Sequence, residues 1–560
     1  MKLRAASVTD GYKVGHGSMY ADGTTKVYSN LTPRSDKIYR RNCTEFYGGN
    51  LVFVGAQGAV QEIKELWDDS FFSQPKEKVI GKYAARMAIY LGGEVAATQQ
   101  LAELHDLGYL PLEFKALPEG SIVPMGIPVI TVTNTVPSAF WLVNYLETVI
   151  SDLTWKTATN ATIAREYKKI CQHFAALTGV DDFTVSIQCH DFSMRGLSGP
   201  EDAARSGFAH LTSFIGTDTL PAMDYAEDYY DAEGLIAISV PATEHAVATN
   251  NILSIEQALS AKTLGSRDRL RLDAETMFME DLITRKFPTG IVSYVADSFD
   301  FWSVLTDILP NLKDVIISRE AAGLAPGKLV IRPDSGDPVL VVCGYRTSKI
   351  EDVDASDIDW VETELLEVDG KYFEYEVDSE YQYGEEYGHR FTLGKEVPVH
   401  EVKGAIECLW ETFGGTVTEK GYKLLDSHIG LIYGDSITTK RALEILTRLE
   451  QKGFASGNVV FGVGSYTYQC NTRDTFGFAV KATYSVVNDN AVNIFKDPKT
   501  DSKKKSAKGL LKVEKDENGK FVLLDQVSQS EEKEGLLQTI LKDGELLNRV
   551  TLDTIRGRLS

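Results

Sequence analysis

Short apolar runs that end in small, polar or charged residues recur along the middle of the chain and predict its main fold. Seven of these runs, each with the loop that follows it, cover 183–196, 213–218, 235–245, 290–300, 328–338, 428–436 and 458–465. Helical patterns separate several of the runs, and strands that alternate with helices are typical of a parallel sheet. We therefore predict an α/β fold, an irregular TIM-like barrel whose loops gather at one end and carry the functional groups there.

The chain on either side of these runs mixes strand and helix patterns. The alternating stretch 26–35 predicts a strand, and apolar residues at three- and four-residue spacing predict helices over 139–153 and 161–177. A strand-like stretch follows Arg473, and a helix is expected near 532–541. We expect three parts: an N-terminal α+β segment over 1–150, the barrel over 151–475, and a C-terminal segment over 476–560 that packs with the first into an α+β domain.

Residues 341–399 interrupt the alternation of strands and helices. The stretch 361–377 predicts a hairpin that turns at Asp369-Gly370. Between 351 and 388 the chain has fifteen acidic residues against one lysine, a net charge of −14 out of −22 for the whole protein. We interpret this segment as an acidic surface insertion, so the overall charge says little about the ligand site.

Composition narrows the class of protein. The chain has 560 residues, of which 43% are hydrophobic and 25% charged, as in an ordinary globular enzyme. A net charge of −22 argues against a nucleic-acid partner, and no apolar stretch approaches the ~20 residues that span a membrane. The six cysteines are scattered without a CxxC pair, and no secretory signal is recognisable. These features predict a reduced, cytoplasmic protein without a structural metal site.

The sequence KLVIRPDSGDP (328–338) is the most informative stretch for function. An apolar run leads into Arg332 and Asp334, and the prolines and Gly336 end the strand in a tight turn. A guanidinium suits phosphate or carboxylate oxygens, and an aspartate suits ribose hydroxyls or a metal-bound water. The alternative is a structural Arg–Asp pair that closes the turn.

Three other strand ends carry candidate groups. Phe192 could stack on a flat ring, and Arg195 could contact a carbonyl or phosphate. The alternative is a core aromatic residue covered by the arginine. Asp218 would accept hydrogen bonds from an amide and repel a carboxylate, or it could cap a helix. His245 could be a nucleophile, a base or a structural imidazole, and a nucleophile would need an orienting acid, Glu244 or Asp297.

Two glycine-containing loops follow the last strands. Gly434-Asp435-Ser436 and Gly464-Ser465 would let a phosphate approach backbone N–H groups, as in barrels that bind sugar phosphates. Two similar motifs fail: GLAPGK has the wrong spacing for a P-loop, and GVGSYT lacks the third glycine of a dinucleotide fingerprint.

Taken in order, DGYKVGH, KVYSN, HDFSMRG, FIGTDT, SVPATEH, SYVADSFD, IRPDSGDP, YGDS, FGVGS, TRD and NIFKDPKTD resemble the nicotinamide phosphoribosyltransferases, a type II phosphoribosyltransferase family. The resemblance implies condensation of nicotinamide with phosphoribosyl pyrophosphate in NAD salvage, with Mg²⁺ and with ATP as co-substrate. It also implies a homodimer with shared active sites. Ser465 and Tyr466 stand where the family pattern has more glycine.

The resemblance also assigns roles to residues of this chain. It implies His245 as a phosphorylated histidine oriented by Asp297, with Asp334 as the third catalytic residue. It implies Arg34, Lys481 and Lys496 as ligands of pyrophosphate or ATP. The implied substrate-binding residues are Asp10, Tyr12, Phe192, Arg195, Asp218, Ser239, Ala242, Ser293, Arg332, Gly434, Asp435, Gly464, Ser465 and Arg473.

Three rival functions stay open at this point. A nicotinate phosphoribosyltransferase is disfavoured because Asp218 would meet a carboxylate substrate. A phosphate-sugar lyase or glycosidase on the same barrel would act without pyrophosphate, using two of the aspartates at the strand ends. A non-catalytic phosphosugar-binding protein would bind ligand without turnover.

Overall fold

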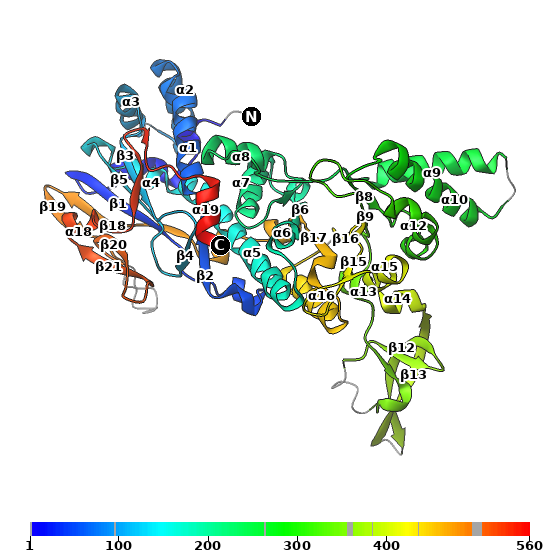
Figure 1. The fold of residues 1–560 in the computed structure, drawn as a ribbon. Helices are drawn as coiled ribbons and strands as arrows, with labels where there is room; N and C mark the ends of the chain where they lie inside the picture. Colours follow the sequence, from blue (N-terminus) through cyan, green and yellow to red (C-terminus); the bar gives the residue numbers. More distant parts are fainter. Residues whose placement is uncertain are drawn as a thin grey trace.

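The computed structural model describes residues 3–93, 97–262, 265–355, 362–382, 385–434, 436–495 and 507–560 (Figure 1). Two sheets organise this part of the chain, one parallel and one antiparallel. The long helix α5 (Glu147–Thr178) contacts the regions around both. Its Thr162 Oγ1 accepts from the backbone N–H of Val52, and its Tyr167 hydroxyl donates to the carbonyl of Ile437, which follows the parallel strand β16.

The parallel sheet has six strands in the order β7-β6-β17-β16-β9-β8. The strands are β6 (Cys189–Asp191), β7 (Gly216–Thr217), β8 (Ile291–Val295), β9 (Lys328–Arg332), β16 (Ile429–Tyr433) and β17 (Val459–Val463). Strand β8 is buried on both faces from Val292 to Val295, as expected for a parallel strand covered by helices. Isolated parallel bridges join Ile238 to Gly216 in β7 and Ala242 to Ser293 in β8.

The antiparallel sheet interleaves strands from both ends of the chain in the order β19-β18-β1-β5-β3-β22-β23. Its strands are β1 (Thr24–Thr32), β3 (Leu112–Ala116), β5 (Ile130–Asn134), β18 (Ala479–Val487), β19 (Asn490–Asn493), β22 (Gln538–Lys542) and β23 (Glu545–Leu546). Three two-stranded antiparallel pairs stand apart from both sheets in the described residues: β2 (Asn50–Phe53) with β4 (Ser121–Pro124), β14 (Gly415–Val417) with β15 (Lys423–Leu425), and β20 (Leu510–Lys515) with β21 (Phe521–Val527).

The helices cover the sheets and connect the strands. Besides α5 they are α1 (Ala56–Trp67), α2 (Lys76–Leu91), α3 (Ala97–Leu107), α4 (Leu142–Tyr145), α6 (Asp182–Ile187), α7 (Pro200–Leu211), α8 (Pro221–Tyr230), α9 (His245–Ser260), α10 (Arg267–Asp281), α11 (Phe301–Ser303), α12 (Leu309–Ile317), α13 (Pro338–Cys343), α14 (Val399–Lys403), α15 (Ala405–Phe413), α16 (Thr439–Gln451), α17 (Ser465–Gln469), α18 (Gln529–Glu532) and α19 (Leu552–Leu559). In the described ranges, none of them is both long and apolar enough to cross a membrane.

The structure confirms the mixed α/β class and corrects several expected elements. The first expected strand begins as helix α6, because Asp181 Oδ1 caps that helix by accepting from the backbone N–H of Thr184 at 2.8 Å. The stretch 235–245 forms only isolated bridges, and 538–542 is strand β22 where a helix was expected. Helix α5 runs continuously through the break expected between 153 and 161. The closed barrel stays a prediction.

The acidic insertion forms its own small sheet, β10 (Thr347–Lys349), β11 (Leu365–Val368), β12 (Lys371–Gln382) and β13 (Glu385–Val397). The expected hairpin is confirmed, with Asp369 and Gly370 at positive φ between β11 and β12. Strands β12 and β13 extend away from the rest of the molecule (Figure 1).

A buried ion pair joins the two ends of the chain. Lys115 Nζ in β3 lies 2.8 and 2.7 Å from the carboxylate oxygens of Glu532 in α18, and both side chains are 11% exposed. Lys115→Met leaves the carboxylate buried without its partner, and we expect the free energy of unfolding to fall by about 3 kcal/mol. Urea unfolding measures this. Lys76→Met, which breaks an exposed pair with Asp106, is the control and should change little; equal stability of both variants would contradict the prediction.

Candidate active site

Polar groups gather where the parallel strands end. The carboxyl ends of parallel strands meet at one edge of a sheet, and loops there carry ligand groups in most α/β folds. Phe192, Asp218, Asp297, Asp334 and Gly434 follow β6, β7, β8, β9 and β16 by one or two residues. Contacts between Asp297 and Asp334 and among Asp334, Gly434 and Phe192 join most of these positions, so the expected gathering of the loops is observed.

Asp218 lies in a pocket of hydrogen-bond donors. Its Oδ1 is 3.1 Å from Nε2 of His190 and accepts from the Ser239 hydroxyl at 2.6 Å. Burial alone would raise the pKa of Asp218, but these two hydrogen bonds and the charge of Arg332 hold it below its ordinary value. Asp218 therefore keeps its negative charge at neutral pH. Its side chain caps no helix, because α8 begins without a side-chain cap.

The ring of Phe192 lies against two glycines of neighbouring strands. A Cβ on Gly462 would approach the ring to 2.5 Å, and a Cβ on Gly434 would lie 3.3 Å from the ring and 3.2 Å from Oδ1 of Asp334. The backbone N–H of Phe192 donates to the carbonyl of Val463 at 3.0 Å. The absence of side chains at these glycines thus lets the aromatic ring sit flat at the sheet edge beside Asp334.

His245 is oriented by Asp297, which decides between the two acids considered from the sequence. Its Nε2 lies 3.0 Å from Asp297 Oδ1, and Asp297 Oδ2 accepts from the backbone N–H of Asp334 at 3.2 Å. The His245 side chain is 46% exposed and Asp297 only 6%. Because Asp297 accepts, the ring proton belongs on Nε2, and the lone pair of Nδ1 is available to a reactant.

Arg332 and Asp334 do not form the structural pair considered from the sequence. In the described part of the chain Arg332 makes no ion pair, and its Nε is buried without a hydrogen-bond partner. The turn is closed instead by Asp337, which caps α13, and by the Tyr433 hydroxyl, which lies 3.0 and 2.9 Å from the carbonyls of Ser335 and Gly336. The guanidinium of Arg332 is left for a ligand.

The second glycine loop and the predicted cations come from different elements. Gly464 directly follows β17 with open space where a Cβ would stand, and Ser465 begins α17 against Gly196, beside the exposed Arg195. The guanidinium of Arg34 donates to the carbonyl of Gly477, close to Arg473, and Lys481 lies in β18 beside β1. Asp435 and Lys496 lie outside the described residues.

Some predicted residues lie elsewhere or have a backbone role. Asp10 Oδ2 accepts from the Thr148 hydroxyl of α5 at 2.7 Å. Tyr12 is 65% exposed, and its ring lies beside His16 and not beside Phe192. Ser293 is buried in β8 and pairs with the bridge at Ala242. Tyr12 thus faces outward from its own chain.

The sequence reasoning gave no role to His190, which the structure places against Asp218. The available indication was strand periodicity: His190 and Phe192 are two residues apart at the end of β6, so both side chains point to the same face. His190 also lies beside the Phe192 ring, with centroids 5.1 Å apart.

No group of three or more His, Cys, Asp or Glu side chains could hold a metal ion within the described ranges. A magnesium ion needs few protein ligands, because phosphate oxygens and water supply most of its shell. Asp334, whose carboxylate has no hydrogen bond among the described residues, fits that demand at the strand ends.

Comparisons with known proteins show the family of the chain. The profile of the nicotinate phosphoribosyltransferase (NAPRTase) family matches residues 187–543. The chain is 45% identical to the nicotinamide phosphoribosyltransferase of Acinetobacter baylyi, over 100% of this chain and 97% of the relative. It is 30% identical to the proteins of the same name from Mycoplasma pneumoniae (90% and 95% covered) and Xanthomonas campestris pv. campestris (98% and 96% covered). The chain belongs to the nicotinate phosphoribosyltransferase (NAPRTase) family.

Proposed function

We propose that this protein is an enzyme that transfers phosphoribosyl from phosphoribosyl pyrophosphate to nicotinamide, giving nicotinamide mononucleotide and pyrophosphate in NAD salvage. The observation that carries the proposal is the ionised Asp218, held by His190 and Ser239 beside the Phe192 ring. An ionised carboxylate accepts hydrogen bonds from the amide NH₂ of nicotinamide, but it has no hydrogen bond to donate to the carboxylate of nicotinate. The full-length relatives named nicotinamide phosphoribosyltransferase support the same reaction.

The second candidate is nicotinate phosphoribosyltransferase, because that name belongs to the family profile. Its substrate carries a carboxylate, which would lie against the carboxylate of Asp218. Like charges that meet in a partly buried pocket cost several kcal/mol of binding. Asp218 therefore favours the amide over the acid.

The transfer step needs a flat nucleophile in line with the ribose. The ring nitrogen of nicotinamide attacks C1′ while the bond from C1′ to the pyrophosphate oxygen breaks, and the electrons of that bond leave with pyrophosphate. Phe192 stacks on the ring, and Asp334 binds the ribose. Arg332 holds phosphate oxygens, with the Gly434 and Gly464 loops giving backbone N–H groups to the 5′-phosphate. Orientation and charge neutralisation are the main contributions of these groups.

The Phe192 wall gives a test of the base site. Gly462→Ala places a methyl group 2.5 Å from the ring, and such overpacking costs about 1–3 kcal/mol. We expect KM for nicotinamide to rise about tenfold in steady-state assays, since 1.4 kcal/mol is a factor of ten. Gly430→Ala, in the same sheet with ordinary contacts near its Cβ, is the control. An unchanged KM in Gly462→Ala would remove Phe192 from the base site.

ATP drives the reaction through His245 in this proposal. Nδ1 attacks the γ-phosphorus of ATP, the bond to the ADP oxygen breaks, and a P–N bond forms that water later cleaves. Asp297 holds the proton on Nε2 and stabilises the positive ring. Arg34, Arg473, Lys481 and Lys496 bind pyrophosphate or ATP phosphates. Magnesium, when bound, neutralises phosphate charge, with Asp334 as a protein ligand.

Two features of the fold support a shared site and a barrel. Tyr12 is exposed and does not reach Phe192 of its own chain, so we propose that a second copy supplies it in a homodimer. The bridges at 238 and 242 join both edges of the parallel sheet, which supports an irregular barrel over 151–475. The interleaved sheet supports an α+β domain of 1–150 and 476–560.

The deciding experiment measures product from nicotinamide or nicotinate with phosphoribosyl pyrophosphate and magnesium, with and without ATP. Nicotinamide mononucleotide from the amide only, increased by ATP, is the expected result. Turnover of nicotinate instead would assign the second candidate. Product without pyrophosphate release would indicate a lyase or glycosidase, and binding without any turnover would indicate a phosphosugar-binding protein.

A further inference from the structure

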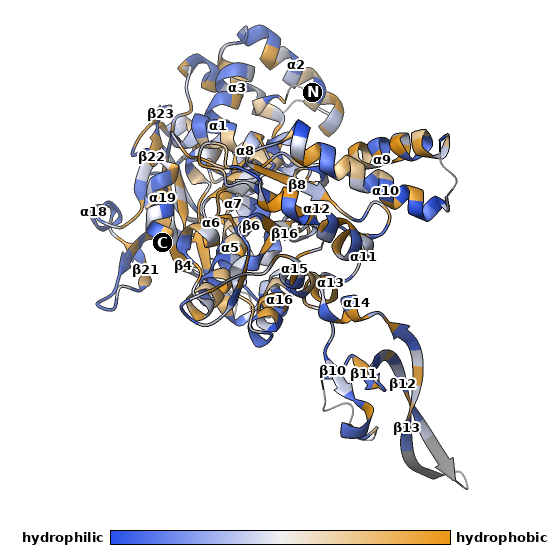
Figure 2. Ribbon diagram, turned by 45° about the vertical axis from the view of Figure 1, so that its right-hand side comes forward, coloured by the Kyte–Doolittle hydropathy of each residue, from blue (hydrophilic) through white to orange (hydrophobic). Residues whose placement is uncertain are grey.

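The acidic insertion branches from a single point between two helices. The inserted module, residues 345–403, leaves the chain at Gly344 after α13 and returns at Gly404 before α15. The two glycines touch: a Cβ on Gly404 would collide with the backbone N of Gly344, and both residues have positive φ, at 75° and 81°. The sheet of the module projects beyond α14, which is the last element of the module (Figure 2).

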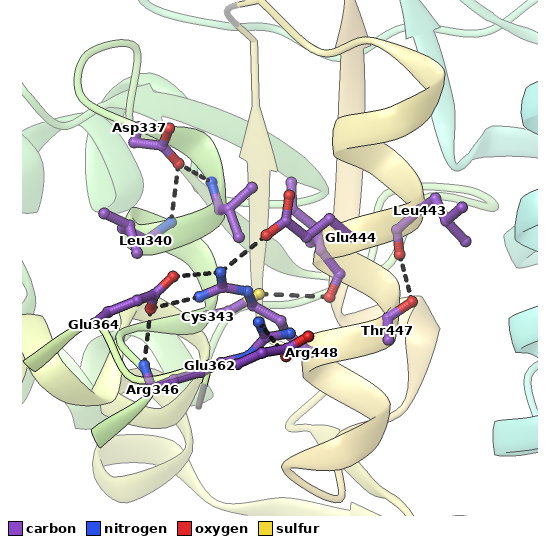
Figure 3. A network of polar contacts seen from close by, with 12 residues as sticks. Asp337, Leu340, Cys343, Arg346, Glu362, Glu364, Leu443, Glu444, Thr447 and Arg448 are labelled. Carbon is purple, nitrogen blue, oxygen red and sulfur yellow. Dashed lines mark hydrogen bonds and ion pairs between the residues drawn. The ribbon is translucent and has the colours of Figure 1, made fainter. Parts of the chain in front are cut away.

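An ion pair joins the module to α16. The Arg448 guanidinium donates to both carboxylate oxygens of Glu364, at 2.9 and 2.5 Å, and to Glu444 at 2.9 Å (Figure 3). Glu364 also accepts from the backbone N–H of Arg346 at 2.9 Å. The Arg448 side chain is only 8% exposed. Burial would raise the pKa of Glu364, but Arg448 holds it below its ordinary value, so both groups are charged at neutral pH.

A second cation of α16 binds the branch point itself. Lys452, one turn after Arg448, donates from Nζ to the carbonyl of Cys343 at 2.8 Å and to the carbonyl of Lys403 at 2.7 Å. These carbonyls end α13 and α14, where a cation is favourable. Nζ also lies 2.7 Å from Glu407 in α15. The end of α16 thus binds the chain where it enters and leaves the module.

Helices α13 and α16 follow the proposed phosphoribosyl loops at their other ends. Helix α13 begins directly after the loop of Asp334, and α16 begins after the loop of Gly434. The two loops touch through Tyr433 and the carbonyls of Ser335 and Gly336. A tilt or slide of α13 against α16 would therefore move Asp334 relative to Gly434. The ion pair of Arg448 and Glu364 opposes such a movement at the far end.

We propose that Arg448 and Glu364 are positioning residues for phosphoribosyl pyrophosphate, because the inserted module ties α13 to α16 and so fixes the spacing of the two loops. The inference rests on the proposed function. The nicotinamide pocket is built instead around Asp218 by His190 of β6 and by Ser239, which belong to other elements than the inserted module. Breaking the ion pair should weaken phosphoribosyl pyrophosphate binding and leave nicotinamide binding unchanged.

The test uses Arg448→Met and Glu364→Gln in the full chain, singly and together. We expect KM for phosphoribosyl pyrophosphate to rise about tenfold in each single variant. The KM of the double variant should not exceed the higher of the two single-variant values, because both substitutions remove the same interaction. KM for nicotinamide should change less than about twofold, within the scatter expected for independent sites. Arg448→Lys keeps the charge and loses the planar fork, so its KM for phosphoribosyl pyrophosphate should lie between the values of the wild type and of Arg448→Met.

Two controls separate positioning from general loss of stability. Lys371→Met breaks the exposed pair with Glu396 inside the module and should leave both KM values unchanged. Titration calorimetry with phosphoribosyl pyrophosphate and magnesium measures binding without turnover, so it separates this inference from the proposed reaction. A lower Tm with unchanged phosphoribosyl pyrophosphate affinity in both single variants would overturn the inference. Wild-type binding without product would reject only the reaction, and no wild-type binding would overturn both.

Discussion

His245→Ala is expected to abolish ATP hydrolysis and the stimulation of product formation by ATP, while slow transferase activity remains. In the proposed mechanism the imidazole, held by Asp297, is the nucleophile, and alanine offers no lone pair to phosphorus. The loss should reach the assay limit for ATP hydrolysis, since covalent catalysis has no substitute once its nucleophile is gone. Transfer of phosphoribosyl should persist, because Phe192, Asp218 and Arg332 remain in place. Coupled ADP release and nicotinamide mononucleotide formation measure the two activities separately.

A matched histidine gives the control for this variant. His428 Nδ1 lies 2.7 Å from Asp426 Oδ1, so it also forms a His–Asp pair, but at the amino end of β16 and away from the loops. His428→Ala should keep ATP hydrolysis and its coupling. Unchanged ATP dependence in His245→Ala would exclude His245 as the phosphorylated residue. Loss of both activities in both variants would point to folding rather than chemistry.

Asp218→Asn is expected to lower the preference for nicotinamide over nicotinate by about 10- to 100-fold, the equivalent of 1.4–2.8 kcal/mol. The asparagine removes the negative charge that repels a carboxylate, and its amide can donate to one. The pKa of Asp218 lies below its ordinary value, so the wild-type charge and its selectivity should persist at neutral pH and fall only as acid protonates the carboxyl. The ratio of kcat/KM for the two bases measures the effect.

Ser239→Ala is the control for the charge. It removes one hydrogen bond to Asp218 and leaves the carboxylate in place, so the amide preference should stay close to the wild-type value. An unaltered preference in Asp218→Asn would show that the base does not lie against this carboxylate. Equal loss of preference in both variants would assign selectivity to the shape of the pocket.

The parts of the fold that the sequence predicted are those with local causes. The run 329–331 is apolar and mostly β-branched, and Pro333 follows two residues later, so the strand and its loop follow from neighbouring residues. The turn at Asp369-Gly370 likewise needs positive φ, which glycine and aspartate tolerate. The start of the expected run 183–196 is helical instead of extended, because Asp181 caps helix α6.

Other parts depend on contacts between distant residues. Strand β22 pairs with β3, more than 400 residues earlier, and nothing near 538–542 indicates that partner. The role of His190 likewise depends on Asp218 in the next strand, and the orienting acid of His245 could be chosen only with Asp297 in view. Sequence patterns located the loops of the site, and tertiary packing decided which side chains meet.

The interleaved antiparallel sheet has a consequence for synthesis on the ribosome. Strands β1 and β3 both pair with β5, but β1 also pairs with β18 and β3 with β22, so each keeps one unpaired edge until residues 479–487 or 538–542 have left the exit tunnel. During translation of the intervening residues, the edges of β1 and β3 offer unpaired N–H and C=O groups to other chains. The sheet is therefore completed only after β22 has been synthesised, and nascent chains that stall before β18 should be the species that require chaperones.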